Sequence, residues 1–238
     1  MAGHRFDERV RRAAPARLFV ALALLGLVGL VPDQARAFDE PDFGAEGILV
    51  IAGLTPKGYW WTDPTLTVYI KGAAKAPAEG VAAVREALAI WNAAIAHRHG
   101  EGLVQFVDVT DTATSPEAAK ADVVINLHRR GGALAGVAHC ESGSCGVPLW
   151  PDSPLSSTGP LTYEQLVSLA VHELGHVLGI GHTIPLVGTL DVMGYGTETN
   201  HWPAPVVSSC DMDAFDVAWA WLINGEAPRP AGVAEIAC

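Results

Sequence analysis

The spacing of hydrophobic residues divides the chain into strands and helices. Residues 66–70 alternate between hydrophobic and polar and are rich in β-branched side chains, which predicts a strand. From residue 77 the period changes, and a hydrophobic stripe with spacings of three and four predicts an amphipathic helix that ends at Gly100 and Gly102. The stripe consists of Val81, Val84, Leu88, Trp91 and Ile95.

Further strands and two more helices follow. Residues 103–109 and 122–128 predict strands, and residues 134–139 and 146–150 are weaker strand candidates. A second helix is expected from Thr162, which forms a capping box with Gln165, to Leu178, where Gly179 and Gly181 follow. A last helix is expected from Asp211 to Ile223, capped by Ser208 or Ser209. This order of elements predicts an α+β fold.

The N-terminal segment has the pattern of a secretory signal peptide. Five arginines precede residue 18, an apolar run covers residues 18–31, and a small-residue triplet ends at Ala37. A membrane anchor is the alternative, but the run is shorter than the roughly 20 residues that span a bilayer. We therefore expect residues 1–37 to be a signal peptide, 38–58 an extended lead-in and 59–238 the folded functional domain of a secreted, periplasmic or extracellular protein.

Charge excludes one class of partner. The formal net charge is −11, and 17% of the residues are charged. Nucleic-acid binding needs clustered Lys and Arg, so we expect no nucleic-acid partner. An acidic surface also repels anionic membranes, so we expect no stable membrane insertion once the signal is removed. No EF-hand loop pattern supports a calcium site.

Four cysteines lie in the segment after the signal: Cys140, Cys145, Cys210 and Cys238. An even number in an exported chain predicts two disulfides. Three pairings are open, and we favour Cys140–Cys145 with Cys210–Cys238. A cysteine metal site is the alternative, but the chain contains no C-x-x-C pair.

The second predicted helix carries a metal-ligand pattern, H-E-x-x-H-x-x-G-x-x-H, over residues 172–182. His172 and His176 lie four residues apart, so both imidazoles leave one face of the helix and can reach one Zn²⁺. Gly179 can take the positive φ that turns the chain back and brings His182 to the same ion. Three imidazoles leave a fourth position for a water molecule, and Glu173 is placed to act as its general base.

This motif, followed by Asp191-Val192-Met193-Gly194-Tyr195, resembles the metzincin zinc endopeptidases. The upstream strands, the helix with Trp91-Asn92 and the closing helix resemble the matrixin branch, over roughly residues 59–225. The resemblance implies a mixed twisted sheet, an active-site helix, a turn with Met193 packed beneath the metal, and a C-terminal helix. It also implies that Tyr195 either approaches the zinc and stabilises the oxyanion or only packs in its loop.

The chain departs from the matrixin pattern in two places. No cysteine precedes Cys140, so the usual propeptide cysteine switch is missing. A carboxylate of the lead-in could block the metal instead, although a solvated acidic lead-in is the other interpretation; the candidates are Asp39, Glu40, Asp42 and Glu46. The second departure lies at the structural zinc site of the matrixin pattern, where His128 is followed here by Arg129 and Arg130. We therefore expect His128 and His139 to be ordinary polar residues, with one catalytic zinc and no structural zinc.

These patterns predict a secreted, monomeric, zinc-dependent endopeptidase that acts on peptides or proteins. The substrate is expected between the strand near residues 134–139 and the active-site helix. Residues 183–190 are expected to form one wall of the pocket that binds a substrate side chain. The alternative is an exported zinc-binding interaction or adhesion domain without turnover.

Overall fold

The computed structural model describes residues 48–51, 61–72, 78–128, 135–141, 143–151, 160–184, 192–194, 205–225 and 234–237. The chain divides into two units, residues 1–32 and 33–238, and all described residues belong to the second. The expected signal peptide and the carboxylates Asp39, Glu40, Asp42 and Glu46 lie outside the described residues.

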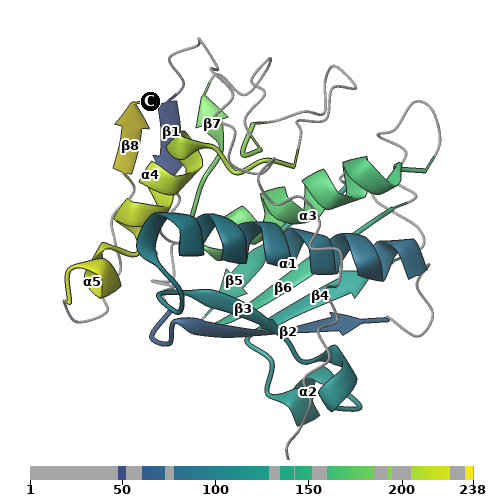
Figure 1. The fold of residues 1–238 in the computed structure, drawn as a ribbon. Coiled ribbons are helices and arrows are strands. Elements are labelled where there is room, and N and C mark those ends of the chain that lie inside the picture. Colours follow the sequence, from purple (N-terminus) through teal and green to yellow (C-terminus); the bar gives the residue numbers. More distant parts are fainter. Residues whose placement is uncertain are drawn as a thin grey trace, which may run out of the picture. The chain divides into compact units, whose positions relative to one another are not determined.

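The centre of the fold is a five-stranded mixed sheet in the order β3-β2-β4-β6-β5 (Figure 1). The strands are β2 (Thr65–Lys71), β3 (Gln105–Asp108), β4 (Val123–Leu127), β5 (His139–Glu141) and β6 (Ser144–Leu149). β3, β2, β4 and β6 pair in parallel, and β5 pairs antiparallel with β6 at the edge. The buried positions of β2 alternate along the strand, as its sequence pattern predicts.

One predicted strand is wrong over most of its length. In the described part of residues 134–139, Gly136 forms a single bridge with Leu149, and regular strand begins only at His139. The backbone N–H of Ala138 donates to the Glu173 carboxylate instead. The Glu173 side chain thus accepts a hydrogen bond from a backbone N–H that a regular strand would use to pair with its neighbour.

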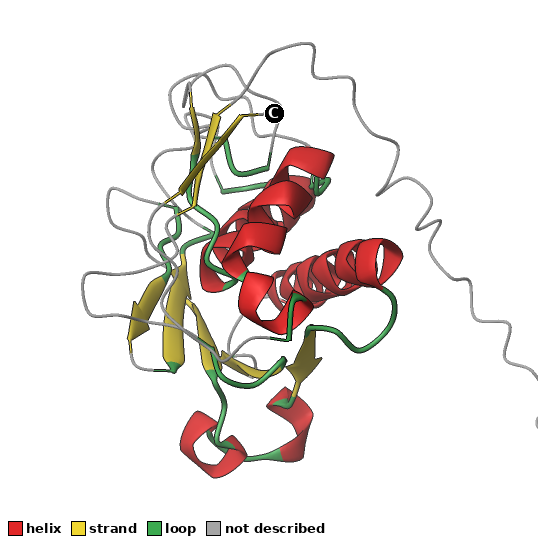
Figure 2. Ribbon diagram, turned by 90° about the vertical axis from the view of Figure 1, so that its left-hand side faces the viewer, coloured by secondary structure: helices red, strands yellow, loops and turns green. Residues whose placement is uncertain are grey.

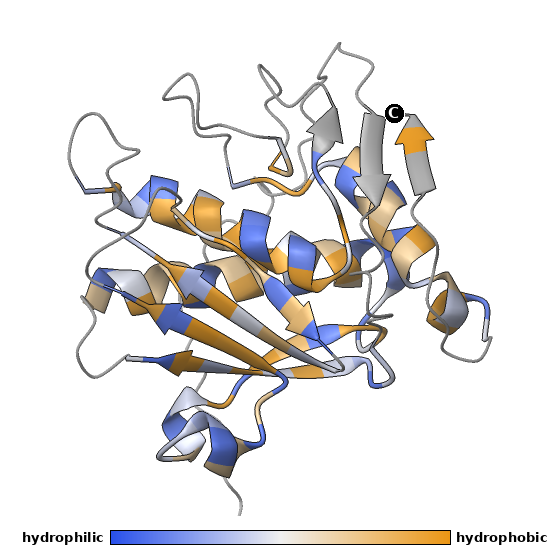
Figure 3. Cartoon of the chain, turned by 180° about the vertical axis from the view of Figure 1, so that it is seen from behind, coloured by the Kyte–Doolittle hydropathy of each residue, from blue (hydrophilic) through white to orange (hydrophobic). Residues whose placement is uncertain are grey.

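Two long helices lie side by side on one face of this sheet (Figures 1 and 2). They are α1 (Ala78–His99) and α3 (Tyr163–Val177), close to the predicted ranges. Hydrophobic positions run along the strands and along both helices, as Figure 3 shows. The core contains four of the five residues of the predicted α1 stripe, including the fully buried Trp91, and the fifth, Val81, packs against the core partly buried. Among the described residues, no helix combines the length and apolar character needed to cross a membrane.

A short helical segment connects β3 to β4. It consists of a 3₁₀ turn, η2 (Thr110–Thr112), and α2 (Pro116–Ala119), which Ser115 caps. The sequence pattern did not predict either element, and both are only one turn long.

A second sheet has three strands in the order β7-β1-β8: β1 (Ile48–Ile51), β7 (Thr183–Ile184) and β8 (Ala234–Ala237). β1 pairs antiparallel with both neighbours. β1 lies inside the expected lead-in, and β7 directly follows His182. The second sheet therefore joins three segments that are far apart in the sequence.

The C-terminal helix differs from the prediction of one helix over residues 211–223. It forms α4 (Ser209–Ala218), capped by Ser208, and α5 (Ala220–Ile223). Trp219 separates them with φ −108° and ψ 16°. Its indole N–H donates to the Leu178 carbonyl at 3.0 Å, so a tertiary contact holds the residue at which the helix breaks.

These elements confirm the predicted α+β class. The predicted Cys140–Cys145 disulfide is present between β5 and β6, where the two residues face each other. Cys210 is also disulfide-bonded, and its predicted partner Cys238 lies outside the described residues.

Candidate metal centre

Helix α3 begins and ends where its sequence dictates. The Thr162 side chain accepts from the Gln165 N–H, and the Gln165 side chain accepts from the Thr162 N–H, so the predicted capping box forms. At the other end Gly179 has φ +92°. Its N–H donates to His176 O and the Ile180 N–H donates to Gly175 O, the two bonds of a Schellman motif. This turn sends the chain back toward the helix.

Tryptophan side chains satisfy carbonyl groups at the end of α3. The Trp61 indole donates to Val177 O at 2.8 Å, and the Trp219 indole donates to Leu178 O at 3.0 Å. Carbonyls in the last turn of a helix have no partner within the helix, and leaving them buried and unpaired costs free energy. The end of α3 that carries the second histidine is therefore fixed by side chains from two other segments.

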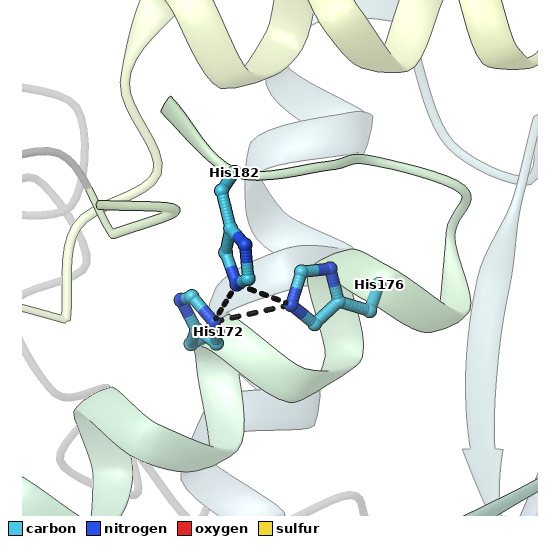
Figure 4. Close-up of side chains that lie close together, drawn as sticks. All are labelled: His172, His176 and His182. Atoms are coloured by element: carbon cyan, nitrogen blue, oxygen red, sulfur yellow. Dashed lines mark hydrogen bonds between the residues drawn. The ribbon is translucent and has the colours of Figure 1, made fainter. Parts of the chain in front are cut away.

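Three imidazoles converge beside α3 (Figure 4). The Nε2 atoms of His172, His176 and His182 form a triangle with sides of 3.1, 3.1 and 3.2 Å. His172 and His176 come from successive turns of the helix, and His182 comes from the segment after the Gly179 turn. Among the described residues, this is the one group of three metal-ligating side chains whose ligand atoms lie this close together.

The hydrogen bonds of the outer ring nitrogens, Nδ1, show which nitrogen of each imidazole carries the proton. His172 Nδ1 lies 2.7 Å from Val192 O, and His176 Nδ1 lies 2.7 Å from Ile180 O. A carbonyl can only accept, so both Nδ1 atoms donate and both Nε2 atoms present lone pairs. Hydrogen bonds of this kind orient imidazoles that bind metals. Converging lone pairs repel one another unless a cation lies between them.

The triangle fits a zinc ion. A tetrahedral zinc about 2.0–2.1 Å from each imidazole nitrogen separates those nitrogens by about 3.3 Å, close to the observed sides. Burial lowers the pKa of His172 well below its ordinary value and that of His176 to about 4, and the neighbouring imidazoles lower both further. Burial also lowers the pKa of His182. All three rings are therefore neutral near pH 7, the form that binds metal.

Glu173 lies buried next to these ligands. The Ala138 N–H donates to its carboxylate, while Oε2 is buried with no hydrogen-bond partner among the described residues. Burial raises the pKa of Glu173 to about 8, and the Ala138 hydrogen bond opposes that rise. A buried carboxylate oxygen without a partner is costly, which marks this atom as available to a ligand or a water molecule.

Met193 packs directly against the motif. Its side chain is fully buried, and a Cβ at Gly175 would lie 2.4 Å from its Sδ atom and 3.2 Å from Trp91 Cζ2. The predicted methionine beneath the site is thus in place, and Gly175 is needed for its close approach. Nothing in the sequence around Gly175 predicts this role, because the contact that requires glycine comes from another segment.

Other candidate residues lie elsewhere. His128 stacks on Trp150 with ring centroids 6.0 Å apart, and His139 is an exposed residue of β5. Neither belongs to the metal-ligating group found among the described residues. Tyr195 lies outside the described residues, as do most of residues 183–190.

No protein-family model matches this chain, and no curated protein matches it. Among solved structures, the chain is similar to archaemetzincin from Methanopyrus kandleri, with 17% sequence identity and a TM-score of 0.41. The similar region covers 70% of this chain and 99% of that one.

Proposed function

We propose that the chain is a zinc-dependent endopeptidase of the metzincin type, closest to the matrixin-like branch. The observation that carries the proposal is the geometry at α3: three Nε2 atoms meet at one point, and Glu173, the residue next to the first of them, has a buried Oε2 with no hydrogen-bond partner among the described residues. His172, His176 and His182 would hold the zinc. Zinc with three imidazole ligands acidifies a water molecule in its fourth position and polarises a carbonyl group.

Glu173 is assigned the proton transfers. Its Oε2 accepts a proton from the attacking water and returns that proton to the leaving amine, so that the peptide bond is replaced by a carboxylate and an amine. The Ala138 N–H donates to the same carboxylate.

The substrate is assigned to the edge of the five-stranded sheet. β5 is the last strand in the sheet order, and residues 135–138, which precede it, lie against Glu173. An extended peptide can add to such an edge by backbone hydrogen bonds, which favours peptide or protein substrates over small molecules.

Export and a monomeric state remain part of the proposal. The Cys140–Cys145 disulfide and the bonded Cys210 support an oxidising compartment, such as the periplasm or the extracellular space. The signal peptide proposed for residues 1–37 would deliver the chain there.

A zinc-binding interaction domain without turnover is the rival function. A site that only holds metal needs its ligands and their outer hydrogen bonds. It does not need a buried carboxylate oxygen without a partner. Glu173 therefore favours catalysis.

Replacing Glu173 tests the proposal. Glu173→Ala should keep about one zinc per chain and reduce cleavage of a mixed peptide library by at least about 10²–10⁴-fold. Glu164→Ala, an exposed acid on the same helix, is the matched control and should behave like the parent. Zinc is measured by elemental analysis and cleavage by mass spectrometry. A parent that binds zinc and cleaves nothing, or a Glu173→Ala variant as fast as the parent, contradicts the enzyme assignment.

Tyr195 has a separate test. If its hydroxyl meets the oxyanion, Tyr195→Phe should lower the cleavage rate by about 10–10³-fold with zinc retained. If the side chain only packs in its loop, the rate should stay near that of the parent.

A further inference from the structure

Gly136 faces the carboxylate of Glu173 from the sheet. A Cβ at this position would lie 2.6 Å from Glu173 Oε1, 3.0 Å from Glu173 Cγ and 3.0 Å from Leu169 Cδ1. Real Cβ atoms do not approach other heavy atoms at 2.6 Å, so any side chain here must displace Glu173. Gly136 does not have a positive φ, so the backbone conformation does not explain the glycine.

The backbone around Gly136 is tied to β6. Trp150 N donates to Ala135 O at 2.8 Å, Val137 N donates to Pro148 O at 3.3 Å, and Gly136 bridges to Leu149. These hydrogen bonds lie on both sides of the glycine. The segment cannot move away from α3 without breaking them, so a larger residue would shift the carboxylate rather than the strand.

The same segment also binds the carboxylate. The Ala138 N–H donates to the Glu173 carboxylate, and Oε2 has no partner among the described residues by geometry. Oε1 is the atom nearest the open face of Gly136. The close approach of Gly136 therefore acts on Oε1, while Oε2 stays buried without a partner among the described residues.

We propose that Gly136 is a positioning residue for Glu173: its missing side chain provides the space that Oε1 occupies, and this placement directs Oε2 toward the reacting water. The inference rests on the proposed catalytic role of Glu173. It assigns to Gly136 no contact with the metal or the substrate.

The first experiment compares two glycine substitutions in the same sheet. Gly136→Ala should lower kcat for peptide cleavage by about 10-fold or more, with KM changed by less and zinc content unchanged, because a small displacement of a catalytic group is costly. Gly146→Ala in β6 is the matched control, since a Cβ there would have no neighbour within 4 Å, and it should cleave like the parent. Equal cleavage by both variants overturns the proposal.

The second experiment needs no activity. We expect Gly136→Ala to lower the thermal midpoint of the zinc-free protein by about 2–10 °C, as overpacking does. In a Glu173→Ala background the shift should be clearly smaller, because the closest clash is gone and only Leu169 remains. Equal shifts in both backgrounds overturn the proposal, since they show that residues 136 and 173 are not coupled.

The two experiments separate the proposals. If the parent cleaves no peptide, the proposed function fails, while the stability comparison still decides whether Gly136 fixes Glu173. If the parent cleaves peptides and Gly136→Ala cleaves equally well, the proposed function stands and the positioning role fails.

Discussion

Two groups of side chains meet at α3, and they are held in different ways. On the imidazole side, His172 and His176 each donate from the outer nitrogen to a backbone carbonyl, and the inner nitrogens converge. On the carboxylate side, Ala138 donates to Glu173, whose Oε1 is confined by Gly136 and whose Oε2 has no partner among the described residues. The first arrangement is typical of ligands that must stay fixed. The second is typical of a group that exchanges a proton.

Removing an imidazole should have the largest effect. His176→Ala leaves two ligands, so zinc should be lost together with cleavage, a larger loss than the roughly 10–100-fold effect of removing an outer hydrogen-bond partner. His128→Ala should keep about one zinc per chain, because His128 stacks on Trp150 instead. Metal analysis of both variants is the measurement. Loss of a second zinc equivalent in His128→Ala would show that the chain has a structural zinc.

Once a chelator has removed the metal, the imidazole side and the carboxylate side should make the stability of the fold depend on pH in opposite directions. The pKa of His176 is about 4 in the fold against an ordinary 6.5, so the unfolded chain binds more protons between these values and stability falls as the pH drops from about 6.5 to 4. The pKa of Glu173 is about 8 against 4.5, so the folded chain binds more protons and stability falls as the pH rises from about 4.5 to 8.

Variants separate these two contributions. Relative to the parent, zinc-free Glu173→Gln should gain stability as the pH rises from about 4.5 to 8, by on the order of a few kcal/mol. Zinc-free His176→Asn should gain relative stability as the pH falls from about 6.5 to 4. Denaturant unfolding across this range measures both. Curves parallel to that of the parent would show that neither group is desolvated as described.

A pair of helical glycines tests the packing beneath the imidazole side. Gly175→Ala places a Cβ against Met193 Sδ and should destabilise the fold by about 1–3 kcal/mol. Gly80→Ala in α1 meets Leu127 Cδ1 at an ordinary 3.5 Å and should stabilise by about 0.5–1 kcal/mol through helix propensity. Chemical unfolding distinguishes the two signs. A gain at both positions would show that Met193 moves aside without cost.

The disulfide should affect the carboxylate side more than the imidazole side. Cys140 and Cys145 join β5 to β6 two residues beyond Ala138, and the loop they close is short, so the double Ser variant should lose about 2 kcal/mol or less. We expect slower cleavage with zinc content unchanged. Loss of zinc with normal cleavage per bound metal would contradict the separation of the two sides.

Local rules predicted the features that depend on neighbouring residues. The capping box at Thr162, the turn at Gly179 and the hydrophobic stripe of α1 each involve residues within a few positions of one another, and all three form. The same is true of the spacing that places His172 and His176 on one helix face. These features follow from helix geometry and backbone sterics alone.

Distant contacts account for what the sequence pattern did not predict. Each strand of the second sheet has two to four residues, too few for a periodic signal, and its partners lie far along the chain. The break at Trp219 depends on the Leu178 carbonyl. Gly136 and Gly175 look like ordinary glycines until Glu173 and Met193 are placed beside them.

The order of strands in the second sheet also constrains the order in which the chain can fold as it is synthesised. β1 lies between β7 and β8, yet it is synthesised before every other described element and β8 after all of them. A chain that emerges N-terminus first therefore carries β1 with one edge unpaired until residue 184 has appeared and the other edge unpaired until residue 237 has appeared. Unpaired strands promote aggregation, so a chaperone that shields β1 during synthesis should raise the yield of folded protein. Because β7 directly follows His182, the third imidazole is fixed only once β1 and β7 have paired, so the group of three imidazoles is completed late in folding.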